Sequence, residues 1–487
     1  MKDILNFTIR EHLDNFKNKK YTVEEFINLC LKQAEDYKDY NIFLRLDPEK
    51  ILKNAKISDK KYVNKENRIL EGIPISIKDN ICEEDEYTTC ASKILENFIS
   101  PYSATVIDKL KQNGAILFGR TNLDEFAMGS STENSAFKVT KNPLDPERVP
   151  GGSSGGSAAC VAAKIVPGSL GSDTGGSIRQ PAAFCGIYGL KPTYGRVSRY
   201  GLVAFASSLD QIGPFARTID DLSLLFSVIQ GYDSKDSTSH PKSNEIPIET
   251  KPKPFTKNEI KNIKIGIYFP EEGEEGYDIY TIKGCQKFRE NLEKEGFQVK
   301  PITSTLWKYS IAIYYILATA EASSNLARYD GIRYGYRYKD AKNLLEVFTQ
   351  SRTKGFGNEV KRRILLGTYV LSSGYYEAFY HKAQKARKKI REEYKEFFKN
   401  FDFILLPTTP TIPFKIGEKI NDPISMYKSD ILTISANLGG IPSLNIPIQS
   451  EESKFPIGIQ IQASHFEENK IFRLAKTFEI LKWVFFV

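Results

Sequence analysis

The sequence is poor in histidine: it has only four, at His12, His240, His381 and His465. None of them lies near the two glycine-rich, serine-bearing segments in the first half of the chain. A Ser-His-Asp triad can be assembled from distant segments, but nothing in the surroundings of these histidines marks one as a catalytic base. We therefore interpret them as ordinary surface residues and look for a base of another type.

Cysteine is also scarce and shows no metal-binding pattern. The six cysteines, spread from Cys30 to Cys285, include no C-x-x-C pair, which excludes the common zinc and redox spacings. Cys160 and Cys185 lie near the glycine-rich segments, but cysteine often packs as a small buried hydrophobe, and we favour that role over a thiol mechanism. Reduced thiols and no metal site are expected, as in a cytoplasmic protein.

No apolar run is long enough to span a bilayer, which takes about 20 residues. Met1–Asn6 contains an acidic residue and lacks the apolar core of a signal peptide, so we expect a cytoplasmic protein with no membrane partner. The net charge of +8, from 68 basic and 60 acidic residues, is small. The densest basic run, Lys382–Arg391, alternates with apolar residues and is interpreted as a solvated helix face rather than an RNA site.

Two glycine-rich segments carry serine: Gly151–Ser157 (GGSSGGS) and Gly171–Arg179 (GSDTGGSIR). A flexible linker would need no order, but the small residues of Ala158–Ala163 indicate a tightly packed buried helix, and Lys164–Gly171 indicates a strand. The two loops are therefore anchored. Glycines in such turns let main-chain N–H groups converge on one point, which is how an oxyanion hole is built.

A candidate base ends the alternating segment Gly72–Asn80 (GIPISIKDN), which predicts a strand. Strand ends are where α/β enzymes place their chemistry. For Lys78 to accept a proton near neutral pH, its pKa must fall from about 10.4 to about 7, and burial can lower it that far. Taken alone, Lys78 would be an ordinary exposed lysine, and only the two serine loops favour a catalytic role.

These three segments together resemble the amidase signature family of serine amidohydrolases. In that family a lysine ends a G-x-P-x-x-x-K-D-N strand, a bridging serine lies in GGSSGG, and the nucleophile lies in D-x-G-G-S-I-R. The resemblance implies a Ser-cisSer-Lys triad, with Ser177 as nucleophile, Ser153 as bridging serine and Lys78 as neutral base. It also implies an oxyanion hole built from the N–H groups of Thr174, Gly175, Gly176 and Ser177.

Three neighbours of the triad are expected to support it. Asp173 and Arg179 flank the nucleophile and would pair to brace its turn. Ser154 has two interpretations that the sequence leaves open. The family uses this side chain to hold the triad network, whereas a serine before a helix can equally cap that helix.

Most of the chain, roughly from Tyr40 to Lys476, carries the resemblance. Three segments resemble one group within the family, the glutaminase subunits of tRNA-dependent amidotransferases. They are Gly189–Gln211, Glu321–Gly331 and Glu359–Arg363. Such a protein holds glutamine through a tyrosine, an arginine that forks onto the α-carboxylate and an aspartate on the α-ammonium. The matching positions here are Tyr314, Arg363 and Asp430, in a register that leaves the neighbours Tyr315 and Arg362 open.

The resemblance implies that Ser177 attacks the side-chain amide of glutamine, ammonia leaves, and water releases glutamate. No metal or organic cofactor is expected in this chain, which lacks the G-x-x-x-x-G-K-[ST] phosphate loop. In the resembling heterotrimers a kinase and amidotransferase B subunit uses ATP and Mg, a small C subunit completes the assembly, and tRNA binds mainly through the partner. The sequence leaves open whether Glu-tRNA(Gln), Asp-tRNA(Asn) or both would be served.

Two other functions are compatible with the same residues. A stand-alone amidase would use the triad on another carboxamide, and its turnover would not depend on partner subunits. A non-catalytic scaffold that retains a glycine-rich anion loop would lose no activity when Ser177 is replaced.

The remaining segments predict an α/β protein. Helical periodicity covers Ile311–Arg328 and Tyr375–Lys399, and apolar alternation predicts strands at Ile263–Ile267 and Asp402–Pro407. Because catalytic positions recur at strand ends and glycine turns, we expect a large mixed β-sheet covered by helices on both faces. This is the amidase-signature fold that the resemblance implies, but its strand order does not follow from the sequence.

Residues 1–60 are expected to form a polar N-terminal helical segment, with a helix that starts at Val23. Residues 61–487 would form a single amidase-signature catalytic domain. Within it, the proline-rich stretch Pro241–Lys257 is interpreted as a surface crossing. The short apolar tail, Trp483–Val487, would dock on the domain or on a partner subunit.

Overall fold

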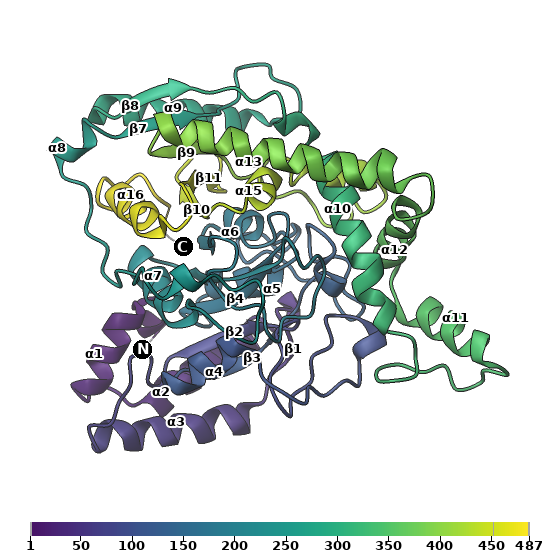
Figure 1. Ribbon diagram of the computed structural model, residues 1–487. Helices are drawn as coiled ribbons and strands as arrows, with labels where there is room; N and C mark the ends of the chain where they lie inside the picture. Colours follow the sequence, from purple (N-terminus) through teal and green to yellow (C-terminus); the bar gives the residue numbers. More distant parts are fainter. Residues whose placement is uncertain (1, 451, 486–487) are drawn as a thin grey trace.

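In the computed structural model, which describes residues 2–450 and 452–485, one mixed sheet runs through the molecule (Figure 1). Within these residues it has eleven strands in the order β1-β3-β2-β4-β6-β5-β10-β11-β9-β7-β8. The predicted large mixed sheet is confirmed. The strands are β1 (Phe43–Arg45), β2 (Pro74–Lys78), β3 (Ile116–Thr121), β4 (Gly168–Asp173), β5 (Tyr188–Lys191), β6 (Gln211–Ala216), β7 (Lys264–Ile267), β8 (Gln298–Pro301), β9 (Phe403–Pro407), β10 (Ser443–Ile448) and β11 (Ile457–Gln462).

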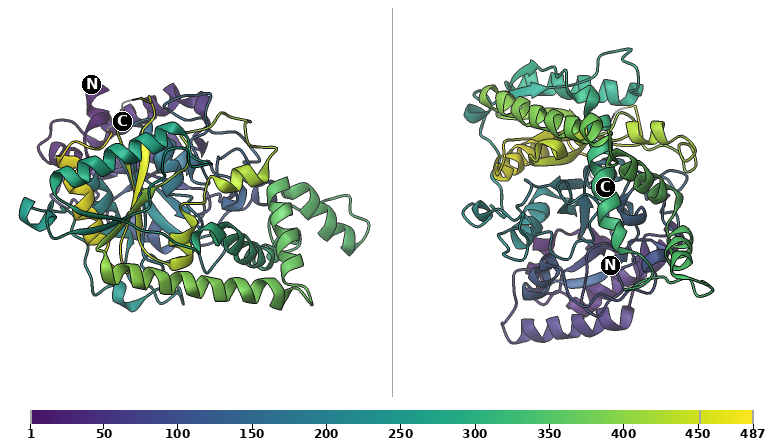
Figure 2. Two further views of the ribbon diagram at one scale, coloured as in Figure 1. Left: turned by 90° about the horizontal axis from the view of Figure 1, so that it is seen from above. Right: turned by 45° about the vertical axis from the view of Figure 1, so that its right-hand side comes forward.

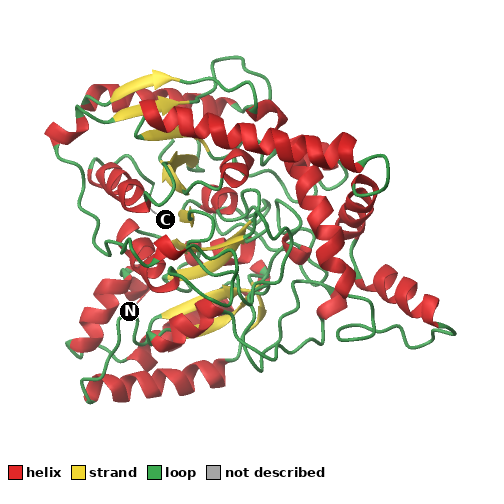
Figure 3. Ribbon diagram, in the orientation of Figure 1, coloured by secondary structure: helices red, strands yellow, loops and turns green. Residues whose placement is uncertain are grey.

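Helices surround the sheet, and Figure 3 shows the strands stacked through the centre with the helices outside them. The α-helices are α1 (Ile9–Lys17), α2 (Val23–Asp36), α3 (Pro48–Val63), α4 (Thr105–Gln112), α5 (Gly155–Ala162), α6 (Arg179–Cys185), α7 (Ile219–Ile229), α8 (Lys257–Ile260), α9 (Ile279–Glu295), α10 (Ser310–Asn325), α11 (Leu344–Gly355), α12 (Asn358–Val370), α13 (Lys382–Asn400), α14 (Pro423–Lys428), α15 (Ile434–Gly439) and α16 (Glu468–Ile480).

Both faces of the sheet are buried under helices, as predicted (Figure 2). Successive residues of a strand point to opposite faces, and β9 shows the result. Phe403 and Leu405 belong to a core cluster that includes α7, α9 and α16, whereas Ile404 and Leu406 belong to a second cluster with α10, α13 and α15. The predicted α/β fold class is therefore confirmed.

The N-terminal segment is mostly helical, as expected, and Met1 lies outside the described residues. Helix α2 begins at Val23 because Thr22 and Glu25 form a capping box, in which each side chain bonds the other's backbone N–H. The segment also contributes β1, which was not predicted and pairs antiparallel with β3 at the sheet edge. Apolar residues of α1 to α3 share one core cluster with the sheet.

The local predictions around the two loops are mostly confirmed. The alternating segment forms β2, and the small-residue segment forms α5, fully buried. The strand predicted from Lys164 is wrong at its start, because Lys164 adopts a left-handed φ of 56° in the turn that follows α5. The strand begins four residues later, at Gly168, and continues through Asp173 to the second loop.

The predicted helices and strands of the second half are also present. Ile311–Arg328 corresponds to α10 and a short 3₁₀ turn that ends at Arg328, and Tyr375–Lys399 corresponds to a π-helical turn (Tyr376–His381) followed by α13. The two predicted strands are β7 and β9, which pair in parallel. No described helix is long and apolar enough to cross a membrane.

The described part of the apolar tail docks on its own chain, while residues 486 and 487 lie outside the described residues. The Trp483 ring stacks on Phe478 with 5.3 Å between centroids. The Phe485 N–H donates to the Pro447 carbonyl at 2.9 Å, which extends the edge of β10. Of the two expected docking places, the domain itself is the one observed.

Candidate active site

Lys78 ends β2 in the interior, where its side chain is fully buried. Its Nζ lies 2.7 Å from Ser153 Oγ and 2.9 Å from Oγ of both Ser154 and Ser172. Burial, which penalises the charged form, lowers the pKa of Lys78 to about 7, although nearby carboxylates act in the opposite direction. The amine can therefore be neutral near pH 7, with a lone pair available to a serine proton.

Ser154 belongs to this polar network and does not cap a helix. Its hydroxyl donates to the Ser172 carbonyl at 3.0 Å, and it makes no side-chain cap hydrogen bond at the start of α5. The structure thus shows the contacts that the network interpretation of Ser154 requires and not those of a helix cap. Ser172, which also accepts from Asn80 Nδ2 at 2.9 Å, was not predicted. Ser172 directly precedes Asp173 in the second glycine-rich segment, and the parallel pairing of β4 with β2, visible only in the structure, brings it to Lys78.

Ser153 and Ser177 lie on loops that touch each other. The Ser154 N–H donates to the Ser177 carbonyl at 3.2 Å, and the Gly152–Ser153 peptide bond is cis. Ser177 occupies the turn between β4 and α6, as predicted, and its hydroxyl makes no hydrogen bond with any described residue. The structure thus brings Lys78 and Ser153 into direct contact and puts Ser177 on the adjoining loop, where its hydroxyl can rotate toward a substrate.

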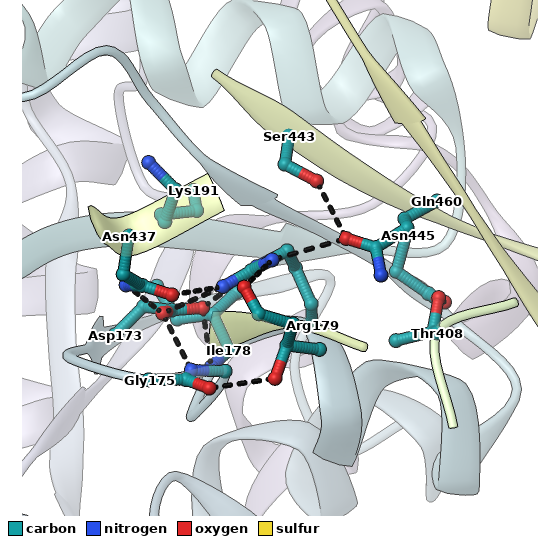
Figure 4. A network of polar contacts seen from close by, with 12 residues as sticks. Asp173, Gly175, Ile178, Arg179, Lys191, Thr408, Asn437, Ser443, Asn445 and Gln460 are labelled. Carbon is teal, nitrogen blue, oxygen red and sulfur yellow. Dashed lines mark hydrogen bonds and ion pairs between the residues drawn. The ribbon is translucent and has the colours of Figure 1, made fainter. Parts of the chain in front are cut away.

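The turn that holds Ser177 is braced by the predicted ion pair between Asp173 and Arg179, both fully buried (Figure 4). The Asp173 carboxylate accepts from Arg179 Nε and Nη2, each at 3.1 Å, and from Asn437 Nδ2 at 2.8 Å. Burial would raise the pKa of Asp173, but the charge and hydrogen bonds of Arg179 outweigh it and lower the pKa to about 2. The pair therefore stays ionised across the physiological range.

The main-chain N–H groups of the loop do not all point the same way. Gly176 N–H donates to Asp173 Oδ1 at 2.9 Å, and Thr433 Oγ1 donates to the Gly175 carbonyl at 2.6 Å on the other side of the same peptide. This corrects the expectation for Gly176, whose N–H is committed to Asp173 rather than open to an oxyanion. The N–H groups of Gly175 and Ser177 make no hydrogen bond with described residues.

Thr174 contributes its side chain to the same region. Its hydroxyl donates to Asp210 Oδ1 at 2.7 Å, and Asp210 in turn accepts from the backbone N–H groups of Phe205 and Ala206. These bonds connect the start of the nucleophile turn to residues 205–210. Whether the Thr174 N–H serves an oxyanion stays a prediction.

The tyrosine register is resolved by what each ring touches. Tyr314, on α10, packs against the nucleophile loop so closely that a Cβ on Gly175 would lie 2.7 Å from its Cζ. Tyr315 points elsewhere: its hydroxyl accepts from Arg363 Nη2 at 3.4 Å, and its ring stacks on Tyr427 with 4.0 Å between centroids. Of the two tyrosines, Tyr314 is therefore the one that packs on the nucleophile loop, and its role in binding a substrate stays a prediction.

The arginine register is resolved by burial. Arg363 on α12 is 3% exposed, and its Nε donates to Glu359 Oε1 at 2.8 Å, whereas the Arg362 side chain is 50% exposed. Tyr427 donates to the same carboxylate oxygen at 2.9 Å. Nη1 of Arg363 makes no hydrogen bond with described residues, so the guanidinium keeps a donor for a ligand. Glu359 was not predicted as a support, although it lies one helical turn before Arg363.

Asp430 is partly buried, and only one of its two carboxylate oxygens has a hydrogen-bond partner. Ser130 Oγ donates to its Oδ2, while Oδ1 has no hydrogen-bond partner among the described residues. Burial raises the pKa of Asp430 to about 7. An unpaired buried carboxylate oxygen is costly, and a cationic ligand group would satisfy it. Nothing in the sequence singles out Ser130, which lies 300 residues away along the chain.

A cavity of about 500 Å³ opens next to these side chains. Its lining includes Arg362, Arg363, Glu359, Tyr427, Ser131 and Glu133. The contacts from Arg363 through Tyr315 and Tyr314 to Gly175 connect this cavity to the nucleophile loop. Thr433 Oγ1 donates to the carbonyls of both Gly175 and Asp430, so Asp430 also adjoins the nucleophile loop.

The histidines and cysteines take no part in it. His12 is buried rather than on the surface, which corrects the prediction: its ring stacks on Phe26 at 3.8 Å, and burial lowers its pKa to about 3. Cys160 and Cys185 are buried free thiols, in line with a packing role. Among the described residues no cluster of His, Cys, Asp and Glu could hold a metal ion.

Comparison with known proteins agrees with this geometry. The glutamyl-tRNA(Gln) amidotransferase A subunit of Persephonella marina is 55% identical over 89% of this chain and 88% of its own. The protein of the same name from Leptospira interrogans serovar copenhageni is 51% identical over 99% and 98%. The crystal structure of the Thermotoga maritima glutamyl-tRNA(Gln) amidotransferase A subunit superimposes with a TM-score of 0.77 at 40% identity, covering 98% of this chain and 95% of that one.

One family model, described as amidase, matches residues 25–472, a span that contains every residue of the site described above. A crystal structure of an amidase, 26% identical, superimposes with a TM-score of 0.81 over 98% of this chain and 100% of that one. The fold, the arrangement around Lys78 and the similarity along nearly the full length lead to the same assignment, and the chain belongs to the amidase family of enzymes.

Proposed function

We propose that this chain is the glutaminase subunit of a tRNA-dependent amidotransferase. The observation that carries the proposal is the fully buried Lys78 amine, 2.7 Å from Ser153 and beside the loop of Ser177. The name shared by the relatives above, at about half identity over nearly the whole chain, supports the choice of glutamine over another carboxamide.

The site supports a two-step acyl transfer. Neutral Lys78 takes the proton of Ser153, which takes that of Ser177, and Ser177 Oγ attacks the amide carbon of the glutamine side chain. The N–H groups of Gly175 and Ser177 would stabilise the oxyanion. As the C–N bond breaks, the proton returns through Ser153 to the leaving ammonia. Water then attacks the acyl-enzyme by the same proton route and releases glutamate.

The substrate would be held by both of its main-chain charges. Arg363 has an unused Nη1 donor for the α-carboxylate, and Asp430 has an unpaired Oδ1 for the α-ammonium. Tyr314, packed on Gly175, would fill the space between these groups and the nucleophile. A ligand that lacks one of the two charges would leave Arg363 or Asp430 without its partner, so the site would favour a free amino acid.

The ammonia would be used by other subunits. We propose a B subunit that activates the tRNA-bound glutamate with ATP and Mg, a small C subunit, and tRNA binding mainly through the partner. This chain itself would need no cofactor. Whether aspartate on tRNA(Asn) is also amidated would be decided by the partner that binds the tRNA.

The test is to measure glutamate release and tRNA amidation by the chain with and without its partner subunits. Ser177→Ala should abolish glutamine hydrolysis and glutamine-dependent amidation, while added ammonium restores amidation in the same complex. A Ser177→Ala complex that still uses glutamine would refute the nucleophile. Hydrolysis of other carboxamides in preference to glutamine, independent of any partner, would favour the stand-alone amidase.

A further inference from the structure

The outer face of α12 and the turn after it carry an exposed apolar patch. Five side chains, each between 40% and 71% exposed, make up what we call the aromatic patch: Leu365, Leu366, Tyr369, Tyr375 and Phe379. The rings touch in sequence, with 4.3 Å between the centroids of Tyr369 and Tyr375 and 5.9 Å between those of Tyr375 and Phe379. The patch is therefore continuous rather than a set of scattered residues.

Such a patch is unusual for a surface that faces only water. Single exposed apolar residues are common, but contiguous ones mark binding surfaces. Aromatic side chains, tyrosine above all, are enriched at the cores of protein interfaces. Leu365 and Tyr369 are four residues apart and share one helix face. The patch thus has the composition and shape of an interface core without a partner present in this chain.

The position of the patch connects it to the active site. Helix α12 buries Arg363 on its inner side, and Arg362, at the edge of the 500 Å³ cavity, lies one helical turn before Leu366. Helix α10 packs along the inner side of α12, so that the outer face of α12 is turned away from the sheet (Figure 1). A protein bound to the aromatic patch would therefore lie beside the mouth of the cavity.

The border of the patch is basic. Lys382 and Lys385 follow Phe379 and are exposed, and Arg362, also exposed, is paired with Glu359. The acid within it, Glu377, is already engaged by His381 Nδ1 at 2.6 Å. A complementary surface would have an apolar centre and an acidic border. A second copy of this chain does not meet this requirement, because a symmetric contact would bring the two basic borders together.

We infer that the aromatic patch is the docking surface for the partner subunit that consumes the ammonia, and that the partner presents an apolar centre bordered by acidic side chains. This inference rests on the proposed function, because it takes its partner from it. The location follows from the exposed aromatic residues and the adjoining cavity mouth, since ammonia released there reaches a docked partner before bulk solvent.

Two charge substitutions on the helix face test the inference: Leu365→Glu and Tyr369→Glu. Both keep good helix formers in α12 and leave the buried residues untouched. Ile57→Glu, an exposed apolar residue of α3 at the opposite end of the molecule, is the matched control. Binding of each purified chain to the co-expressed partner subunits is measured by titration, with circular dichroism as the check of folding.

The two patch variants should weaken binding by at least about tenfold and lose glutamine-dependent amidation, while glutamine hydrolysis by the isolated chain and the Ile57→Glu control stay at wild-type levels. Unchanged binding of both patch variants would overturn the inference. The inference would also be overturned if the patch variants bound the partner normally but lost self-association or tRNA binding. The patch would then serve a second copy of the chain or an RNA.

A measurement on the wild-type chain covers the case in which a variant misfolds. Hydrogen exchange of residues 364–380 should slow when the partner subunits bind, and exchange of α3 should not. Equal exchange in the free and bound chain would overturn the inference without any substitution. The outcome is separate from that of Ser177→Ala, which tests the chemistry and should leave assembly intact.

Discussion

Two buried lysines of this chain show what makes one of them a base. Lys78 and Lys191 are both fully buried, and burial lowers the pKa of each to about 7. Lys78 contacts three serine hydroxyls, whereas among the described residues the Nζ of Lys191 donates only to the carbonyl of the next residue, Pro192, at 2.9 Å. A depressed pKa is thus necessary for the proposed chemistry, but contact with Ser153 is what gives the amine a proton to take.

This difference leads to a paired prediction. Lys78→Met should lower kcat for glutamine hydrolysis by roughly 10²- to 10⁴-fold, the usual contribution of a general base. Lys191→Met, which removes a buried amine of the same kind, should keep kcat near the wild-type value. Steady-state kinetics on both folded variants gives the comparison. Equal losses in the two variants would mean that the buried charge pattern, and not the proton relay, supports activity.

The pH dependence of the reaction should report two groups of the site. Lys78 must be neutral to accept a proton, and Asp430 must be ionised to bind an ammonium. Both requirements are met only as pH rises through about 7, the pKa that burial gives to each group. The value of kcat/KM should therefore increase with pH from about 6 to about 8, and its logarithm should approach a slope of two on the acid side.

Asp430→Asn separates the two groups. The variant should bind glutamine more weakly, and the acid-side slope of log kcat/KM should fall to one, because only Lys78 is left to titrate. A wild-type profile that is flat or falls between about pH 6 and 8 would contradict the neutral-amine scheme. The measurement needs only initial rates of glutamate release in buffers of constant ionic strength.

At the scale of elements, the nucleophile turn depends on a glycine that no other residue can replace without strain. Gly176 has a φ of 136°, and a Cβ at this position would lie 2.2 Å from Thr433 Oγ1. The Thr433 hydroxyl donates to the carbonyl of the Gly175–Gly176 peptide, and Asp173 accepts from the N–H of the same peptide. A shift of Thr433 would therefore also move this peptide. The turn is fixed from both sides of a single peptide plane.

Gly176→Ala should therefore destabilise the fold by about 1–3 kcal/mol and lower kcat along with it. Gly374→Ala is the matched control, because Gly374 also has a positive φ, of 84°, but no atom would lie within 4 Å of the added Cβ. Urea unfolding and glutaminase rates are measured for both. If the two variants lose the same stability and the same activity, the clash with Thr433 has no role.

Local sequence signals were sufficient for most elements and insufficient for the contacts between them. A few consecutive residues carry the alternating pattern of β2, and a few others carry the capping box of α2. Both elements form where predicted. Lys164 shows the limit of such patterns. It adopts a left-handed turn conformation after α5, so the strand begins only at Gly168. The order of the strands depends on non-local pairing, such as β5 with β10, which a single sequence does not encode in any local pattern.

The same limit applied to the site. Lys78, Ser153 and Ser177 could be proposed as a triad from the sequence because each lies in a distinctive short motif, and the structure places Lys78 against Ser153 with the Ser177 loop beside them. The choice between Arg362 and Arg363 could be made only from burial, and Ser130 and Thr433 could be recognised only from their contacts with Asp430 and Gly175. Side chains that support a site from distant segments carry no pattern of their own, so the structure is needed to find them.

At the scale of the whole molecule, the N-terminal segment and the remainder are joined by shared packing. The helical composition of residues 1–60 predicts a boundary near residue 60, yet β1 adds to the sheet and the apolar residues of α1 to α3 share its core. Polar ties cross the same boundary. Arg217 Nη2 donates to the Leu5 carbonyl at 2.9 Å, and Gln33 Nε2 donates to the Ala163 carbonyl at 2.9 Å. A boundary in secondary structure need not be a boundary in stability.

We therefore predict that residues 1–60 unfold together with the rest of the chain. The only tryptophans, Trp307 and Trp483, report on the C-terminal half by fluorescence. Cys30 on α2 and Cys285 on α9 are both fully buried, so that alkylation read by mass spectrometry reports on each end separately. The segment exposes much of the shared apolar core when it detaches, which makes separate unfolding costly. Alkylation of both thiols and the fluorescence change should share one urea midpoint, whereas alkylation of Cys30 at a clearly lower urea concentration than Cys285 would establish an independently unfolding N-terminal unit.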